Sequence, residues 1–273
     1  MSPFGMRLHA AVAEFGSLCA GVDPHPALLA SWGLTDDADG LARFAEACVA
    51  AFAGHVAVVK PQSAFFERHG ARGIAVLEGL LEAFAGTPTL TILDVKRGDI
   101  GSTMDGYADA YLAVGAPLGA DAVTLSPYLG FGSLSAALDT AADAGRGAFV
   151  LARTSNPEGA PVQLAEFGGR RTAQSMADGA AARNAGAQPL GDVGVVVGAT
   201  RDHGLDLSAL NGPVLAPGLG AQGAGPADIA PIFAGVQGLV LPAASRSVLT
   251  AGPAVPSLRA AATSLRDELA AAV

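Results

Sequence analysis

The stretch TLTILDVKRGDIGSTMDGYADAY, residues 89–111, combines three features that decide how the chain is expected to fold. Residues 89–93 form a short apolar run that is typical of a buried parallel strand. Four charged residues lie between positions 94 and 99, and residues 102–115 then have the character of an amphipathic helix. The stretch therefore predicts one strand, a charged strand end and one helix, which together make a β/α unit.

The same unit recurs along the chain, and eight apolar runs that alternate with helical stretches predict an α/β protein with a closed (β/α)₈ TIM barrel. An open doubly wound sheet is the alternative, but residues 21–26 read GVDPHP instead of the Gly-rich fingerprint of that fold. The inserts 153–169 and 199–212 are expected to be loops, so residues 1–273 are predicted to form one barrel domain. The expected strands are 17–22, 55–59, 89–93, 121–125, 147–151, 192–198, 213–216 and 237–241, and the expected helices are 39–53, 71–85, 102–115, 131–144, 170–185 and 257–272.

Composition excludes several classes of protein. Of the 273 residues 51% are hydrophobic and 15% are charged, yet no run approaches the ~18 uninterrupted apolar residues of a membrane span, so no membrane association is expected. The net charge of −9 argues against a nucleic-acid partner, because such a protein needs basic surface to neutralise phosphates. A small anionic ligand remains compatible with this charge, since it needs only a few local cations and backbone amides.

Cysteine and histidine give no sign of a metal site. Cys19 and Cys48 lack metal-ligand spacing and are expected to be small core residues in a reducing compartment. The five histidines are scattered without an HxxxH or HxH pair, so no metal site is predicted. The first residues, MSPFGMRLHAAVAEFG, lack the pattern of an export signal, and a cytoplasmic location is expected.

Charged side chains gather where the first three expected strands end. Asp23 follows the first strand, Lys60 follows the second, and Asp94, Lys96 and Asp99 follow the third. In a TIM barrel the carboxyl ends of the strands are where catalytic groups converge. Because side chains two residues apart on a strand share a face, Asp94 and Lys96 are expected to lie side by side.

Lysine is rare in this chain. Of the 16 Lys and Arg residues only Lys60 and Lys96 are Lys, and both lie at these strand ends. Arg stays protonated in proteins, whereas Lys can give up a proton and take it back, so a position that delivers a proton can hold Lys but not Arg. Function is the favoured interpretation of the pair, and structural ion pairing at the barrel mouth is the alternative.

The loops after the last two expected strands have the composition of a phosphate site. Barrels often bind phosphate there, and the chain offers APGLGAQGAGPAD after the seventh strand and PAASRSVL after the eighth. Gly218, Gly220 and Gly223 let backbone amides approach an anion, Gln222 can donate an amide, and Arg246 offers a bidentate fork. A flexible surface loop beside an ordinary surface Arg is the alternative.

Taken in order, LDVKRGDIGST, PGLGAQG and SRS resemble the orotidine 5′-phosphate decarboxylase family, in particular its longer-chain branch, from about Cys19 to Leu249. Asp94, Lys96 and Asp99 match the D-x-K-x-x-D signature of the family, with Ser102 where many members have Asn. The resemblance implies a (β/α)₈ barrel and a homodimer without cofactor or metal. It also implies that Asp99 and Thr103 reach the active site of the partner subunit.

The activity implied by the resemblance is the conversion of orotidylate to uridylate and CO₂ in de novo pyrimidine biosynthesis, with Lys96 as proton donor in a direct decarboxylation. By the same resemblance, Asp94, Asp99 and Lys60 join Lys96 in the catalytic set. The implied substrate contacts are Asp23 and Lys60 to the ribose, Ser155 to the pyrimidine, and Gln222 and Arg246 to the phosphate. The expected substrate-binding residues also include Thr103, Pro217, Gly218 and Gly223.

Three other functions remain open on the sequence. A sugar-phosphate decarboxylase or aldolase of the same superfamily resembles this pattern but uses a magnesium ion held by acidic residues. Lys96 could instead form a Schiff base with a carbonyl substrate. Residues 97–99 also spell Arg-Gly-Asp, the tripeptide of adhesion proteins, although here it follows a strand that is expected to be buried.

Overall fold

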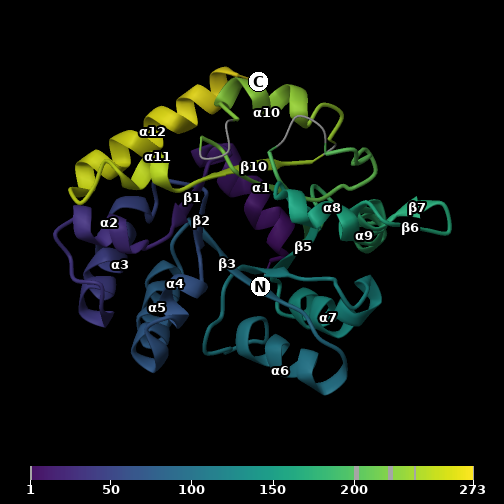
Figure 1. Ribbon diagram of the computed structural model, residues 1–273, viewed down its shortest axis with the longest axis horizontal. Coiled ribbons are helices and arrows are strands. Elements are labelled where there is room, and N and C mark those ends of the chain that lie inside the picture. The colour runs from purple at the N-terminus through teal and green to yellow at the C-terminus, as the bar shows by residue number, and fades with distance from the viewer. Residues whose placement is uncertain (1, 200–202, 221–223, 237, 273) are drawn as a thin grey trace.

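The computed structural model describes residues 2–199, 203–220, 224–236 and 238–272. Its centre is a closed barrel of parallel strands in the order β1-β10-β9-β8-β5-β4-β3-β2, and helices surround this barrel (Figure 1). The predicted (β/α)₈ barrel is therefore confirmed. The barrel strands are β1 (Cys19–Val22), β2 (Val58–Pro61), β3 (Leu90–Arg97), β4 (Ala122–Leu125), β5 (Gly147–Arg153), β8 (Val193–Val197), β9 (Val214–Pro217) and β10 (Val240–Ala244).

The helices include all six that the sequence predicts, together with shorter ones at strand ends and in inserts. None of the described helices is both long and apolar enough to cross a membrane. They are α1 (Phe4–Phe15), α2 (Pro26–Ser31), α3 (Ala38–Phe52), α4 (Ala64–Glu67), α5 (Gly70–Phe84), α6 (Gly101–Tyr111), η1 (Phe131–Leu134), α7 (Ser135–Asp143), η2 (Pro157–Gly159), α8 (Ala160–Gln163), α9 (Thr172–Arg183), α10 (Pro226–Ile232), α11 (Arg246–Leu249) and α12 (Val255–Ala271).

Alternation along the strands divides the apolar residues into two cores. Ile92 and Phe149 point into the barrel, whereas their neighbours Leu93 and Val150 point outward and pack with the surrounding helices. This is the period-two geometry of a strand that is buried on both faces. It explains why the strands read as continuous apolar runs in the sequence.

Helix α1, which the sequence did not predict, closes the amino-terminal end of the barrel. Phe4 and Leu8 are fully buried with the inward-facing core, and the Phe4 ring meets the Phe149 ring edge to face at 6.0 Å. The Gly5 amide donates to Asp192 Oδ1 at 2.7 Å, directly before β8. With this end closed, the carboxyl end of the barrel is left as the open mouth.

Two strand boundaries differ from the prediction by three residues. Strand β2 begins at Val58 instead of residue 55, because the amides of His55 and Val56 bond to the carbonyl of Phe52 in the turn after α3. Strand β10 likewise begins at Val240 instead of residue 237. Strand β2 also ends at Pro61 instead of residue 59, and this later end places Lys60 inside β2 rather than after it.

The insert 153–169, expected to be a loop, contains regular structure. It holds η2, α8 and the strand β6 (Glu166–Phe167), which pairs with β7 (Arg170–Arg171) in an antiparallel hairpin that projects from the barrel (Figure 1). Gly168 and Gly169 form its turn with φ of 61° and 77°, a conformation that suits glycine in two-residue hairpins. Residues 203–212 of the other insert are irregular, as predicted.

Candidate active site

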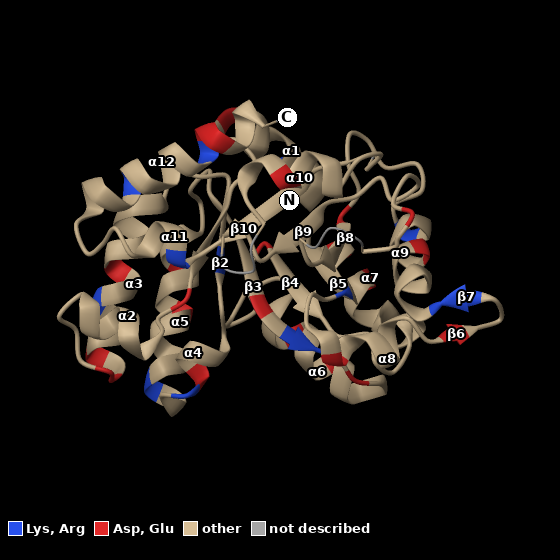
Figure 2. Cartoon of the chain, turned by 45° about the horizontal axis from the view of Figure 1, so that its top comes forward, with Lys and Arg blue, Asp and Glu red and all other residues tan. Residues whose placement is uncertain are grey.

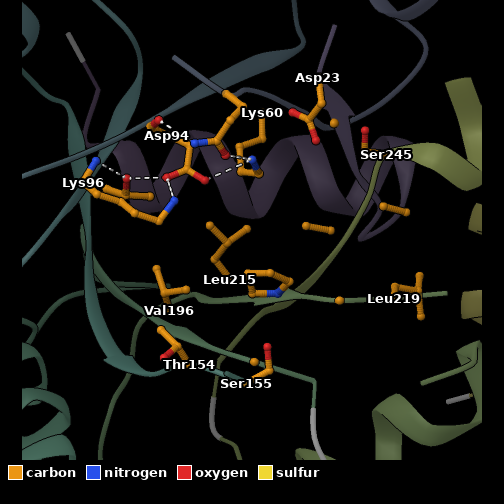
Figure 3. A pocket seen from close by; sticks show the side chains of 18 of the residues that line it. Asp23, Lys60, Asp94, Lys96, Thr154, Ser155, Val196, Leu215, Leu219 and Ser245 are labelled. Atoms are coloured by element: carbon orange, nitrogen blue, oxygen red, sulfur yellow. Dashed lines mark hydrogen bonds and ion pairs between the residues drawn. The ribbon is translucent and has the colours of Figure 1, made fainter. Parts of the chain in front are cut away.

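A cavity of about 450 Å³ lies at the carboxyl ends of the barrel strands, and we call it the barrel-mouth cavity. Figure 3 shows side chains from opposite sides of the barrel pointing into it. Strand ends far apart in the sequence meet here, as the fold requires. The predicted site residues that line it are Asp23, Lys60, Asp94, Lys96, Ser155, Pro217, Gly218 and Arg246.

Asp94 lies between the two lysines of the chain. Lys60 Nζ is 3.1 Å from Asp94 Oδ2, and Lys96 Nζ is 2.5 Å from Asp94 Oδ1. Thr124 on β4 donates its hydroxyl to Asp94 Oδ1 at 2.8 Å. The result is a row of alternating charge, Lys60–Asp94–Lys96, which Figure 3 shows along one wall of the cavity.

Burial and pairing fix the charges in this row. Burial alone would raise the pKa of Asp94, but the adjacent Lys60 and Lys96 outweigh it and hold that pKa at about 2. Burial would lower the pKa of Lys60, and the carboxylates of Asp23 and Asp94 outweigh it and raise that pKa. The Lys96 side chain is 45% exposed, against 7% for Lys60, so Lys96 is the more accessible of the two lysines to a ligand in the cavity.

Lys96 is held in an unusual backbone conformation. Its φ is 46°, in the left-handed region, which costs a non-glycine residue roughly 1–3 kcal/mol. The pairing of β3 with β4 shifts register between Leu93 and Arg97, and the Lys96 amide donates to Thr124 Oγ1 at 2.9 Å. The prediction that Asp94 and Lys96 lie side by side is confirmed, but an irregularity of β3 produces it, not regular strand geometry.

Asp99 and Thr103 are absent from the described residues that line the barrel-mouth cavity. Asp99 is half-buried and accepts the amide of Ile100 at 2.8 Å, and Thr103 is exposed on the first turn of α6. Arg97, the first residue of the Arg-Gly-Asp tripeptide, is turned toward α4, where it pairs with Glu67 at 2.6 Å. A side chain engaged in this way does not present the tripeptide for adhesion.

The opposite side of the cavity holds the predicted phosphate residues that the structure describes. Pro217 ends β9, Gly218 follows with φ of 110°, and Arg246 begins α11 with its side chain exposed at the rim. Gly220, also predicted to approach an anion, has φ of 75° but is absent from the described lining of the cavity, and its amide donates to the carbonyl of Ala224. Gln222 and Gly223, also predicted to bind here, lie outside the described residues.

Several lining residues were missed in the sequence: His25, Gln62, Thr124 and Ser245. Gln62 accepts from Lys60 Nζ at 3.2 Å, and its position two residues after Lys60 was a signal that could have revealed it. Ser245 directly precedes Arg246, and its Oγ is buried, as is Asp23 Oδ1. Neither oxygen has a hydrogen-bond partner among the described residues, and both belong to residues that line the cavity.

The arrangement offers chemistry based on fixed charge. The cavity presents the accessible ammonium of Lys96 and the ionised carboxylate of Asp94 beside it. At its rim lie the guanidinium of Arg246 and the backbone of Gly218. Groups of three or more His, Cys, Asp or Glu that could hold a metal ion are absent from the part of the chain that the structure describes. In the cavity lining, the carboxylates of Asp23 and Asp94 both raise the pKa of Lys60, and Asp94 forms an ion pair with it at 3.1 Å.

Comparison with known proteins gives one consistent result. The profile of the "Orotidine 5′-phosphate decarboxylase / HUMPS family" matches residues 16–261. The chain is 59% identical to the orotidine 5′-phosphate decarboxylase of Salinispora arenicola and 53% identical to that of Streptomyces coelicolor, in each case over 100% of this chain and 99% of the relative.

The chain is also similar to a protein of known crystal structure from Streptomyces avermitilis, which is described as an orotidine 5′-phosphate decarboxylase. It superposes with a TM-score of 0.95 at 52% identity, over 100% of this chain and 96% of that one. The match extends over the whole barrel and both walls of the cavity. The chain belongs to the orotidine 5′-phosphate decarboxylase / HUMPS family.

Proposed function

We propose that this protein is a carboxy-lyase that converts orotidylate to uridylate and CO₂ by direct decarboxylation without a cofactor. The observation that carries the proposal is the Lys60–Asp94–Lys96 row at the mouth of the barrel. The identity of 59% to a relative of that name, over the full length of both chains, supports the same reaction.

In the proposed reaction the bond between the pyrimidine ring and its carboxylate breaks, and CO₂ leaves. The electron pair stays on the ring carbon, where no adjacent carbonyl can delocalise it. Lys96 stabilises this negative charge with its ammonium and then transfers a proton to the carbon, which completes uridylate. Electrostatics must supply most of the catalysis, because the protein forms no covalent bond to the substrate.

Asp94 and Lys60 have different parts in this scheme. Asp94 is ionised, since its pKa is about 2, and a carboxylate beside the departing carboxylate disfavours the bound substrate more than the transition state. Lys60 keeps Asp94 ionised and fixed at 3.1 Å. Asp94 in turn forms the 2.5 Å ion pair that keeps the Lys96 ammonium at the wall of the cavity.

The rest of the cavity suits a nucleotide. The buried oxygens of Asp23 and Ser245 can accept or share hydrogen bonds with ribose hydroxyls. Arg246 and the backbone from Pro217 and Gly218 would bind the phosphate, together with Gln222 and Gly223 outside the described residues. Ser155, on the wall after β5, is assigned to the pyrimidine.

We also propose a homodimer in which Asp99 and Thr103 enter the site of the partner. Three large apolar side chains are exposed beside them: Ile100 by 61%, Tyr128 by 80% and Leu129 by 52%. The loops after β3 and β4 are adjacent, since Ser126 donates its amide to the carbonyl of Arg97 at 2.7 Å. A second copy of the chain would cover this apolar surface and deliver Asp99 as the next negative charge beside Lys96.

A cytoplasmic location and a place in pyrimidine nucleotide synthesis complete the proposal. Cys19 and Cys48 are free and buried, which is typical of a reducing compartment. Uridylate is itself a pyrimidine nucleotide, so the reaction yields the product of such a pathway.

The proposal is tested by following the ultraviolet absorbance of orotidylate with purified protein in excess chelator. We expect loss of orotidylate with one CO₂ per uridylate formed, at the same rate with and without chelator. Turnover that stops in chelator and returns with Mg²⁺ would favour the magnesium-dependent alternative. Absence of orotidylate turnover under both conditions would contradict the proposal.

A further inference from the structure

Arg97 follows Lys96 in β3 but points away from the barrel-mouth cavity. Its Nη2 donates to Glu67 Oε1 at 2.6 Å and to the hydroxyl of Tyr111 at 3.4 Å. The guanidinium also lies over the rings of Tyr107 and Tyr111, at 5.7 and 6.0 Å from their centroids. Arg97 thereby ties the end of β3 to α4 on one side and to α6 on the other.

The contacts of Glu67 lead back to the charged row. Ser63 donates its hydroxyl to Glu67 Oε1 at 2.6 Å, and the Ser63 amide donates to the backbone carbonyl of Asp94 at 3.2 Å. The chain of contacts Asp94–Ser63–Glu67–Arg97 therefore passes behind Lys96. It fixes the backbone two residues before Lys96 and one residue after it.

Such a frame is needed because Lys96 has an unfavourable backbone. Its φ of 46° persists only when neighbouring structure determines it. Gly98 adds to the constraint on the far side, since a Cβ at this position would be 2.1 Å from the carbonyl oxygen of Ser126. The side chain of Arg97 is the part of this frame that joins two helices to the strand end.

We propose that Arg97 is a positioning residue that, through Glu67 and the two tyrosines, holds Lys96 in the conformation that places its ammonium beside Asp94. The inference rests on the proposed role of Lys96 as proton donor. Arg suits the position because its planar fork can bond Glu67 and stack on aromatic rings at once, which an ammonium cannot do equally well.

The experiment compares Arg97→Met with Arg146→Met in steady-state turnover of orotidylate. Arg146 is a matched control: its half-buried guanidinium also secures the end of α6, by donating to the carbonyls of Tyr111 at 2.8 Å and Ala120 at 3.0 Å, but it has no contact with Lys96. We expect kcat of Arg97→Met to fall by about 10- to 100-fold while KM stays within about twofold, because a small misplacement of a catalytic group has effects of this size. Arg146→Met should lose stability but keep kcat within about twofold.

Two further variants keep the test decisive if Arg97→Met folds poorly. Arg97→Lys should restore part of kcat, because it can pair with Glu67 although it lacks the fork. Glu67→Gln should lower kcat several-fold at unchanged KM, and its effect should not add to that of Arg97→Lys, since both act through one contact.

If the wild type turns over orotidylate and the Arg97 and Glu67 variants keep its kcat, the positioning role of Arg97 is wrong and the proposed function stands. Equal losses of kcat in Arg97→Met and Arg146→Met would also overturn the positioning role, because they would show general destabilisation. Absence of turnover in the wild type would overturn the proposed function, and this inference with it.

Discussion

In the proposed reaction, Lys96 donates its proton from a position that its surroundings fix. The chain uses Arg almost everywhere else, and at this position it accepts a left-handed backbone that non-glycine residues rarely adopt. The cost is offset locally, by the amide bond to Thr124 and by the ion pair with Asp94.

The charged row Lys60–Asp94–Lys96 could be predicted from the sequence, whereas the threonine that supports it could not. Asp94 and Lys96 stand out because charge is costly at a buried strand end unless it is used or paired. Thr124 looks like any threonine of a strand, and its role depends on the register of β3 against β4, which the sequence does not show. The strain at Lys96 likewise results from a register shift that only the structure reveals.

The low pKa of Asp94 predicts how stability depends on pH. Its folded pKa of about 2 lies below the ordinary 3.8, so its contribution to stability is present above pH 4 and is lost as the pH falls from about 4 to 2. A shift of this size corresponds to about 2 kcal/mol. The measurement is the free energy of unfolding of the wild type and Asp94→Asn at several pH values between 5 and 2.

We expect the advantage of the wild type over Asp94→Asn to be largest at pH 5 and to shrink over this range. An advantage that stays constant down to pH 2 would show that Asp94 has an ordinary pKa or does not stabilise the fold through its charge.

At the scale of elements, the eight strands could be predicted because each is a short apolar run, and most of them are followed by a helical stretch. Helix α1 could not, since it precedes the first strand and stands outside the repeat of β/α units. The β6–β7 hairpin was missed because strands of two residues are too short to show a period of two. Figure 2 shows charged residues on both of these short strands, which matches their exposure to solvent.

The role of α1 as the floor of the barrel predicts a large loss of stability for Phe4→Ala. Phe4 is fully buried against Phe149, and removal of such a ring costs about 3–5 kcal/mol. The kcat for orotidylate should change little, because α1 lies at the end of the barrel away from the cavity. Chemical denaturation and steady-state kinetics measure the two effects.

Phe167→Ala is the matched control for this prediction. Phe167 is 93% exposed on the hairpin, so its removal should change stability by no more than about 0.5 kcal/mol. Equal effects of the two substitutions would show that α1 does not hold the barrel closed.

At the scale of the whole molecule, the exposed apolar surface beside Asp99 predicts a shared active site. In the proposed dimer each site uses Lys96 of one chain and Asp99 of the other, so Lys96→Ala and Asp99→Asn should each be nearly inactive. After exchange of chains between them, one site of each mixed dimer carries both lesions and the other is intact. With random exchange, activity should recover to about one quarter of wild type, as a two-fold interface requires.

Chain exchange is confirmed by native mass spectrometry before activity is compared. Exchange without recovery of activity would show that Asp99 acts within its own subunit, or outside catalysis.

In the proposed reaction Lys96 delivers a proton and does not serve only as a cation. The direct measurement is kcat/KM for orotidylate of Lys96→Arg beside Lys96→Ala and wild type, with the affinity for uridylate as a check that the cavity is intact. We predict that Lys96→Arg is nearly as inactive as Lys96→Ala, because a guanidinium is too weak an acid to protonate the ring carbon and too large for the space beside Asp94. Substantial turnover by Lys96→Arg would contradict the account and leave Lys96 as a structural cation.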